Sequence, residues 1–130
     1  MTLTYRAECA APAERAWVLV ACPRRWHEWA PHVRGAHGLG SPEIELGARG
    51  AVLLLGALPV PVRITGKRPG RSWSWQVGPV EIEHRVEARA GGCSVIVELR
   101  APAAIALPLR VTYGPLVAVL VRNLARVASG

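Results

Sequence analysis

A single histidine interrupts the apolar face of a predicted strand over residues 80–89. Its odd positions are all charged, whereas its even positions are apolar except for His84. A period of two is typical of a strand with one wet and one dry face, so His84 should lie on the dry face. There it could shuttle a proton, since an imidazole titrates near neutral pH, or orient a ligand through one hydrogen bond. Alternatively, it is a satisfied histidine of an ordinary core.

Two further polar residues are candidates for the same site. Tyr113 lies on the apolar stripe of a predicted C-terminal helix, where its hydroxyl could donate into a pocket or lie at the rim of a core. Arg49 begins an apolar run, and it would point inward together with Leu53 if the odd positions of that strand face the interior. An inward arginine would bind a carboxylate or stabilise an enolate. Both phases of this run are apolar, so the sequence leaves the direction of Arg49 open.

Apolar side chains on the same predicted faces are candidates for ligand binding. Trp73 and Trp75 alternate with serines, so both rings share the dry face of their strand. Flat rings suit an aromatic or polycyclic ligand by offset stacking, but they equally suit the filling of a core. The remaining candidates are Ile82 and Val86 beside His84, Leu53 on the apolar run, and Leu116 and Leu120 on the helical stripe.

The N-terminal part of the chain predicts a strand followed by two short helices. Residues 2–9 alternate as a strand does. A helix follows to about Ala21, with Pro12 suited to its first turn, and a second covers residues 24–29. Trp26 and Trp29 share a face of the second helix because they are three residues apart. Together with Trp17 they are predicted to anchor the two helices by packing.

The rest of the chain predicts a meander of strands and then a helix. Residues 34–41 are a poorly periodic strand or loop, and the apolar run has the length of a strand. After residue 102 the apolar spacing becomes three or four, which predicts a terminal helix over 115–128 with a kink at Gly114–Pro115. The strands are expected over 49–57, 60–65, 72–77, 80–89 and 93–100, with turns at 58–59, 67–71, 78–79 and 91–92.

This order of elements predicts an α+β fold in a single domain spanning residues 1–130. A curved antiparallel sheet of six to seven strands would wrap round the C-terminal helix, with the two short helices after the first strand. One helix cannot fill such a sheet, so the geometry leaves an internal hydrophobic cavity, and ligand sites favour apolar concavities.

Composition excludes several classes of function. The net charge is +7, but the arginines are scattered and no stacking-aromatic and basic motif accompanies them, so no nucleic-acid partner is expected. The spacing of His27, His32 and His37 fits no helical ligand pair, and no metal site is predicted. An odd count of three cysteines without C-x-x-C fits reduced, mostly buried thiols.

Nothing in the sequence predicts stable membrane insertion. No uninterrupted apolar run reaches the about 18 residues that a span needs, and the first residues lack the apolar block of a signal peptide. The expected location is therefore the cytoplasm. The sequence does not fix the oligomeric state, and a homodimer stays open.

The chain resembles the START-like superfamily, also called SRPBCC or helix-grip, and within it the bacterial polyketide cyclase/dehydrase-like members. The similarity covers nearly the whole chain in the order of its elements, and the Trp-x-x-Trp-x-Pro stretch ending at Pro31 is its most specific part. The chain departs from the family pattern in lacking Phe and in placing two prolines in the terminal helix. The segments that carry the resemblance are 11–17, 23–31, 47–49, 73–75 and 123–128.

The resemblance implies a cavity between sheet and helix that binds a lipid, sterol or aromatic polyketide, and dry-face residues of central strands would line it. It carries over no catalytic residue, because the family has no common catalytic motif. Two hypotheses follow. One is an enzyme without cofactor that cyclises or dehydrates a polyketide-like molecule, with His84 and either Tyr113 or Arg49 moving protons. The other is a non-catalytic carrier or sensor of a lipid-like ligand.

Overall fold

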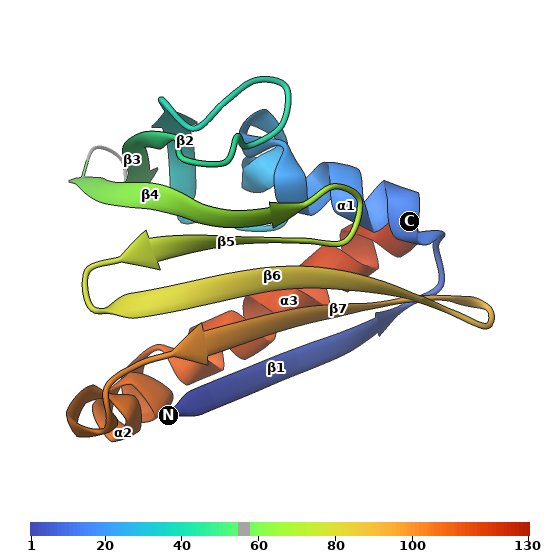
Figure 1. The fold of residues 1–130 in the computed structure, drawn as a ribbon. Helices are drawn as coiled ribbons and strands as arrows, with labels where there is room; N and C mark the ends of the chain where they lie inside the picture. The colour runs from blue at the N-terminus through green and yellow to red at the C-terminus, as the bar shows by residue number, and fades with distance from the viewer. Residues whose placement is uncertain (55–57) are drawn as a thin grey trace.

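A curved antiparallel sheet of seven strands, in the order β1-β7-β6-β5-β4-β3-β2, forms one layer of the molecule (Figure 1). The computed structural model describes residues 1–54 and 58–130. The predicted α+β fold with a curved sheet and a C-terminal helix is confirmed. The strands are β1 (Thr2–Cys9), β2 (Val33–His37), β3 (Arg49–Leu54), β4 (Leu58–Arg68), β5 (Ser72–Val77), β6 (Val80–Arg89) and β7 (Gly92–Arg100).

Helices cover one face of this sheet. After β1 come α1 (Ala13–Ala21) and the 3-10 helix η1 (Pro23–Glu28), as predicted. The chain ends in α2 (Ala103–Thr112) and α3 (Gly114–Ser129), and α3 packs against β1, β7 and α1. Figure 1 shows α3 running along the sheet, with α2 at one end of it and α1 at the other.

The predicted kink separates the two C-terminal helices. They are bent by 61° relative to each other, and Tyr113 lies between them. A Cβ atom on Gly114 would lie 2.3 Å from the Tyr5 hydroxyl oxygen, so a larger residue here would require the Tyr5 side chain to move. Among the described residues no single helix has the length and apolar character to cross a membrane, and α2 and α3 meet that test only as a bent pair.

The turn predicted at Leu58–Pro59 is wrong. Leu58 pairs with Leu54 and Pro59 pairs with Leu53, so β4 already begins at Leu58. The register between β4 and β5 begins only at Arg63, so the first part of β4 has no described partner on its β5 side. Proline, which has no N–H, is tolerated on such an edge segment. The last part of the predicted strand 49–57, residues 55–57, lies outside the described residues.

The alternation along β6 divides the sheet into a buried and a solvent-facing side. The even residues Val80, Ile82, His84 and Val86 are buried, which confirms the predicted dry face. The three cysteines are buried and free, as their number and spacing predicted.

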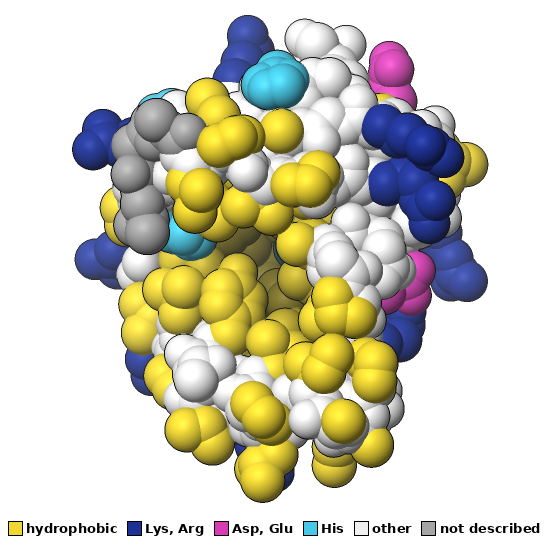
Figure 2. All heavy atoms as spheres, turned by 90° about the vertical axis from the view of Figure 1, so that its left-hand side faces the viewer, with side chains coloured by type: hydrophobic (Ala, Val, Ile, Leu, Met, Phe, Trp, Pro, Cys, Tyr) yellow, Lys and Arg dark blue, Asp and Glu magenta, His cyan; other side chains and the backbone are white. Residues whose placement is uncertain are grey.

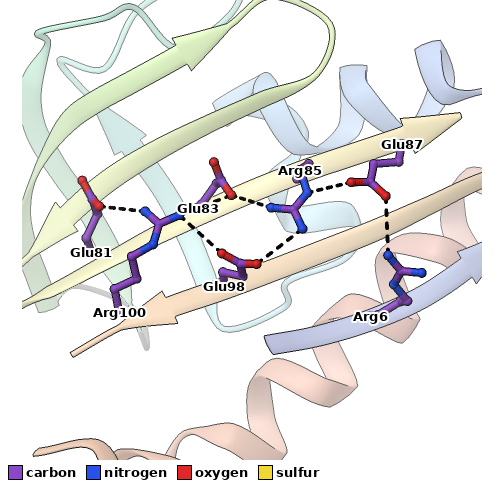
Figure 3. A network of polar contacts seen from close by, with 7 residues as sticks. All are labelled: Arg6, Glu81, Glu83, Arg85, Glu87, Glu98 and Arg100. Atoms are coloured by element: carbon purple, nitrogen blue, oxygen red, sulfur yellow. Dashed lines mark hydrogen bonds and ion pairs between the residues drawn. The ribbon is translucent and has the colours of Figure 1, made fainter. Parts of the chain in front are cut away.

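The charged positions form an ion-pair network on the opposite side of the sheet (Figure 3). Arg85 contacts Glu83 at 2.6 Å, Glu87 at 3.0 Å and Glu98 at 3.4 Å. Arg100 contacts Glu98 at 3.3 Å. These contacts link β6 to β7. The charged side chains of β6 therefore stabilise the sheet and do not belong to a ligand site.

Replacing Arg85 with methionine is expected to lower the free energy of unfolding by about 1 kcal/mol at low salt, because three carboxylates lose their shared partner. The loss should shrink as salt screens the remaining charges. Urea unfolding at two salt concentrations measures both effects. Arg6→Met is the matched control, since Arg6 has one exposed contact with Glu87 at 3.4 Å and should change little. Equal losses in the two variants would contradict the network's contribution.

Candidate functional site

A cavity of about 290 Å³ lies between the sheet and α3. Its lining comes from η1 and the loop after it, from every strand except β1, and from α2, Tyr113 and α3. The volume is at the lower end of the range of about 300–1,000 Å³ that is typical of small-molecule sites. Figure 2 looks onto the end of the molecule where α2 and the β5–β6 turn lie, and it shows a hollow surrounded by hydrophobic side chains. The elements at this end also expose Leu58, Leu107 and Val111.

The alternation of the central strands explains why particular side chains line the cavity. Val80, Ile82 and His84 follow one another along the dry face of β6 from the open end inward, and all three line the cavity. On β5, Trp73 is paired in register with His84, and Trp75 with Ile82. His84 therefore lies at the inner end of the cavity, beside two indole rings.

Aromatic rings form a packed group around His84. The Trp73 ring stacks with the His84 ring at a centroid distance of 3.9 Å and with the Trp26 ring at 5.6 Å. Trp75 stands edge-on to these rings, with its centroid 5.1 Å from Trp73 and 5.5 Å from His84. Such stacked and edge-on arrangements are the preferred geometries of aromatic pairs, so the inner wall of the cavity is rigidly built.

The C-terminal end of α1 holds three of the indoles in place. The last carbonyl groups of a helix lack partners within the helix. Here Val20 O accepts hydrogen bonds from Trp26 Nε1 at 2.9 Å and from Trp73 Nε1 at 3.1 Å. Leu19 O accepts one from Trp29 Nε1 at 2.9 Å. Trp26 and Trp29 are thus anchors, as the sequence predicted, and they also form cavity wall, which the sequence did not predict.

Three nitrogen atoms in residues that line the cavity have no hydrogen-bond partner. Among the buried side-chain nitrogens and oxygens of residues 1–54 and 58–130, only His32 Nδ1, Trp75 Nε1 and His84 Nδ1 lack one. Buried polar atoms are normally bonded, so each exception needs an explanation. All three residues line the cavity, but the three nitrogen atoms themselves are enclosed by neighbouring groups.

Burial keeps the ionisable groups of the cavity uncharged. It lowers the pKa of His84 to about 3, against a smaller opposing effect of the Trp73 backbone. It also lowers the pKa of His32 and raises that of the Tyr113 hydroxyl. The expectation that His84 titrates near neutral pH is therefore wrong, because a charged imidazole would be buried among apolar groups. At neutral pH His84 can give or take a hydrogen bond, but it is a weak base.

A sequence profile described as polyketide cyclase/dehydrase and lipid transport matches residues 1–128. The chain belongs to this family. No curated protein matches the chain.

Solved structures share the fold of this family member. A conserved protein of unknown function from Enterococcus faecalis, EF2215, has a TM-score of 0.76 at 12% identity, covering 98% of this chain and 71% of its own. A solution structure from Thermobifida fusca has a TM-score of 0.72 at 20% identity, covering 92% and 90%. DynU16, from the dynemicin biosynthetic locus, has a TM-score of 0.68 at 19% identity, covering 96% of this chain and 46% of its own. At these identities the likeness shows the fold alone.

The structure of this family member brings most of the candidate residues together. His84 and Tyr113, two of the three residues predicted to act on protons, both line the cavity. Four of the residues predicted to bind ligand also line the cavity, namely Trp73, Trp75, Ile82 and Leu120.

The structure does not place Arg49 and Leu53 in the cavity. The even positions of β3 face inward, so Val52 and Leu54 form the wall there. Arg49 is exposed, and its register partner on β4 is Arg63. The sequence left open whether Arg49 points inward. It does not, because the even positions of the strand face the interior and Arg49 is at an odd position.

Two more candidates lie outside the lining. Val86 is buried on the dry face of β6 but lies beyond His84, where α1 contacts the strand. Leu116 is 37% exposed, because the stripe of α3 that faces the cavity passes through Val117, Leu120, Val121 and Leu124. The predicted helix is confirmed, but its cavity-facing stripe begins at Val117 and not at Leu116.

Some of the wall could have been found from the sequence. Val60 and Val62 alternate on β4 and line the cavity, as a strand pattern with one dry face implies. His32 carries no such signal, because it lies in the turn between η1 and β2. Within the described part of the chain no three His, Cys, Asp or Glu side chains gather as a metal site would require.

Proposed function

We propose that this protein binds a flat, hydrophobic small molecule, aromatic or polyketide-like, in the cavity and acts as its carrier or sensor. The observation that carries the proposal is the cavity of about 290 Å³, whose inner wall is a group of tryptophan rings. Stacking and edge-on contacts with these rings favour a planar partner. Membership of the family supports a hydrophobic ligand.

The electrostatics of the wall favour binding over acid–base catalysis. The described residues that line the cavity include no Asp, Glu, Lys or Arg. A general base works best when its pKa lies near the working pH, and burial holds the pKa of His84 at about 3. No carboxylate lies in the described lining to stabilise a protonated imidazole.

Cyclisation or dehydration of a bound polyketide is the second candidate function. It is supported by the family and by Tyr113, whose ring lines the cavity together with the two histidines. In this case the rate would come mainly from positioning a reactive chain against rigid walls, since proximity alone can supply a large share of catalysis.

A cavity-filling variant tests the proposal. Leu120→Trp places a large ring where Leu120 lines the cavity, and it should weaken binding of the neutral fluorescent probe N-phenyl-1-naphthylamine at least roughly tenfold, the equivalent of about 1.4 kcal/mol. Fluorescence titration measures the dissociation constant, and native mass spectrometry of the wild type looks for a co-purified hydrophobic compound.

The same substitution outside the cavity provides the control. Leu116 lies on α3 one turn away and is 37% exposed, so Leu116→Trp should leave probe binding unchanged. Probe binding that is equally strong in both variants, with thermal midpoints like that of the wild type, would show that the cavity is not the binding site.

A further inference from the structure

We propose that the end of the molecule around the cavity opening docks reversibly on a lipid bilayer that contains anionic phospholipid. In the docked state α2 lies in the interface between headgroups and acyl chains, and the cavity opens toward the bilayer. We define the opening face by its exposed large side chains Leu58, Leu107 and Val111. This interaction surface goes beyond the binding of a small molecule in the cavity.

The first argument is the composition of α2, which is apolar on every side although the helix lies at the surface. Its one charged residue is Arg110, and only Ala106 is buried. Leu107 is 64% exposed and Val111 is 67% exposed. A helix that is hydrophobic all round normally lies in a protein core or in a membrane. α2 packs against α3 and β1, but its outer side lacks the apolar environment that such a sequence favours.

The second argument is that the cavity opens within this apolar surface. Figure 2 shows a hollow surrounded by hydrophobic side chains at the end where α2 lies. Leu109 and Tyr113 line the cavity, whereas Leu107 and Val111 of the same helix are exposed. The apolar lining therefore continues into an exposed apolar surface, and such surfaces mark sites of interaction with proteins or membranes. With this face on a bilayer, a hydrophobic ligand passes between acyl chains and cavity without crossing water.

The third argument is charge complementarity. Residues 101–130 contain Arg110, Arg122 and Arg126 but no Asp or Glu. Within the part of the chain that the structure describes, none of the three forms an ion pair, in contrast to Arg85 and Arg100 on the sheet. In Figure 2 the hydrophobic side chains lie at the centre of this face, and Lys and Arg side chains lie toward its margins. An apolar centre with basic residues around it suits an anionic bilayer, because long arginine side chains reach the headgroups.

A bilayer fits the opening face better than a protein does. Protein interfaces are enriched in aromatic residues and are joined by hydrogen bonds, whereas α2 exposes mainly aliphatic side chains. Its Thr112 hydroxyl already donates to Pro108 O at 2.7 Å, which leaves Arg110 as the one free side-chain donor of this fully described helix. A second copy docked on this face would close both cavities to their ligands.

Vesicle flotation tests the docking. The wild type should float with vesicles made of equal amounts of phosphatidylcholine and phosphatidylglycerol. It should bind vesicles of phosphatidylcholine alone roughly tenfold more weakly, because the arginines then lack anionic partners. Added salt should weaken binding to the mixed vesicles and bring it toward the level of phosphatidylcholine alone.

Variants assign the binding to the opening face. Leu107→Glu and Val111→Glu should each weaken binding to the mixed vesicles at least roughly tenfold, because each replaces an apolar contact with a charge. Leu46→Glu is the matched control, since Leu46 is also 64% exposed and lies in the loop before β3, at the end of β3 opposite the pair of Leu54 with Leu58. It adds the same charge and should keep most of the binding. Circular dichroism of the exposed-site variants confirms that all three are folded.

The outcomes separate this inference from the proposed function. A folded wild type that does not bind the mixed vesicles would overturn the docking and leave the proposed function intact, since probe binding is measured without lipid. Equal losses in Leu107→Glu and Leu46→Glu would also overturn it, because added charge alone would then explain them. A dimer that forms without lipid and is abolished by Leu107→Glu, in a protein that does not bind vesicles, would assign the face to a second copy.

Discussion

Replacing Trp73 with alanine is expected to lower the free energy of unfolding by about 3–5 kcal/mol. Trp73 is 1% exposed, stacks with both Trp26 and His84, and donates a hydrogen bond to Val20 O. Its removal therefore enlarges the cavity at its inner wall and takes away one of the two indole donors to Val20 O. Urea unfolding followed by far-ultraviolet circular dichroism measures the change.

Trp75→Ala is the matched comparison on the same strand. Trp75 is only half-buried and its indole nitrogen has no partner, so the stability loss should be clearly smaller than for Trp73. Its ring faces the cavity, so the loss of ligand affinity should be the larger of the two effects. A Trp75 variant as unstable as the Trp73 variant, with unchanged probe binding, would assign both rings to the core.

The strand pattern of this chain could be predicted because its alternation is explicit. Over residues 80–89 every odd position is charged, and a charged side chain does not face an apolar interior without a partner, so the phase is decided by the residues themselves. The position of His84 follows from that phase, and its neighbours Trp73 and Trp75 follow from the short turn at 78–79 that fixes the register.

The phase of β3 could not be predicted for the opposite reason. Both faces of this strand carry apolar residues, so nothing local separates Leu53 from Val52 and Leu54. The outcome depends on pairing with β4, whose Val60 and Val62 face the cavity. Register is a tertiary property in such a strand, and the direction of Arg49 could be read only from the folded chain.

The chemistry of His84 also needed the structure. Its type and spacing place an imidazole on the dry face, but its pKa depends on what surrounds it in space. The stacked Trp73 ring comes from a neighbouring strand, and the Trp26 ring that completes the group comes from η1, more than forty residues away in the sequence. Sequence reasoning thus found the residue and misjudged its protonation.

The pH dependence of stability tests that protonation state directly. The pKa of His84 is about 3 in the folded protein and about 6.5 in an unfolded chain, so between these values only the unfolded chain binds the proton. The stability that the neutral ring contributes is complete above pH 6.5 and is lost as the pH falls toward 3. Because each pH unit is worth about 1.4 kcal/mol, the wild type should lose roughly 3 kcal/mol between pH 6.5 and 4 from this residue alone.

His84→Phe removes the titrating group and keeps a flat ring against Trp73, so the variant should become more stable than the wild type as the pH falls. Urea unfolding at several pH values isolates the effect, because the carboxylates that also titrate in this range are the same in both proteins. His37→Phe, at an exposed position, is the control and should follow the wild-type profile. Parallel profiles of wild type and His84→Phe would mean that the buried ring takes up a proton in the folded state, and His84 would return as a candidate acid–base group for catalysis.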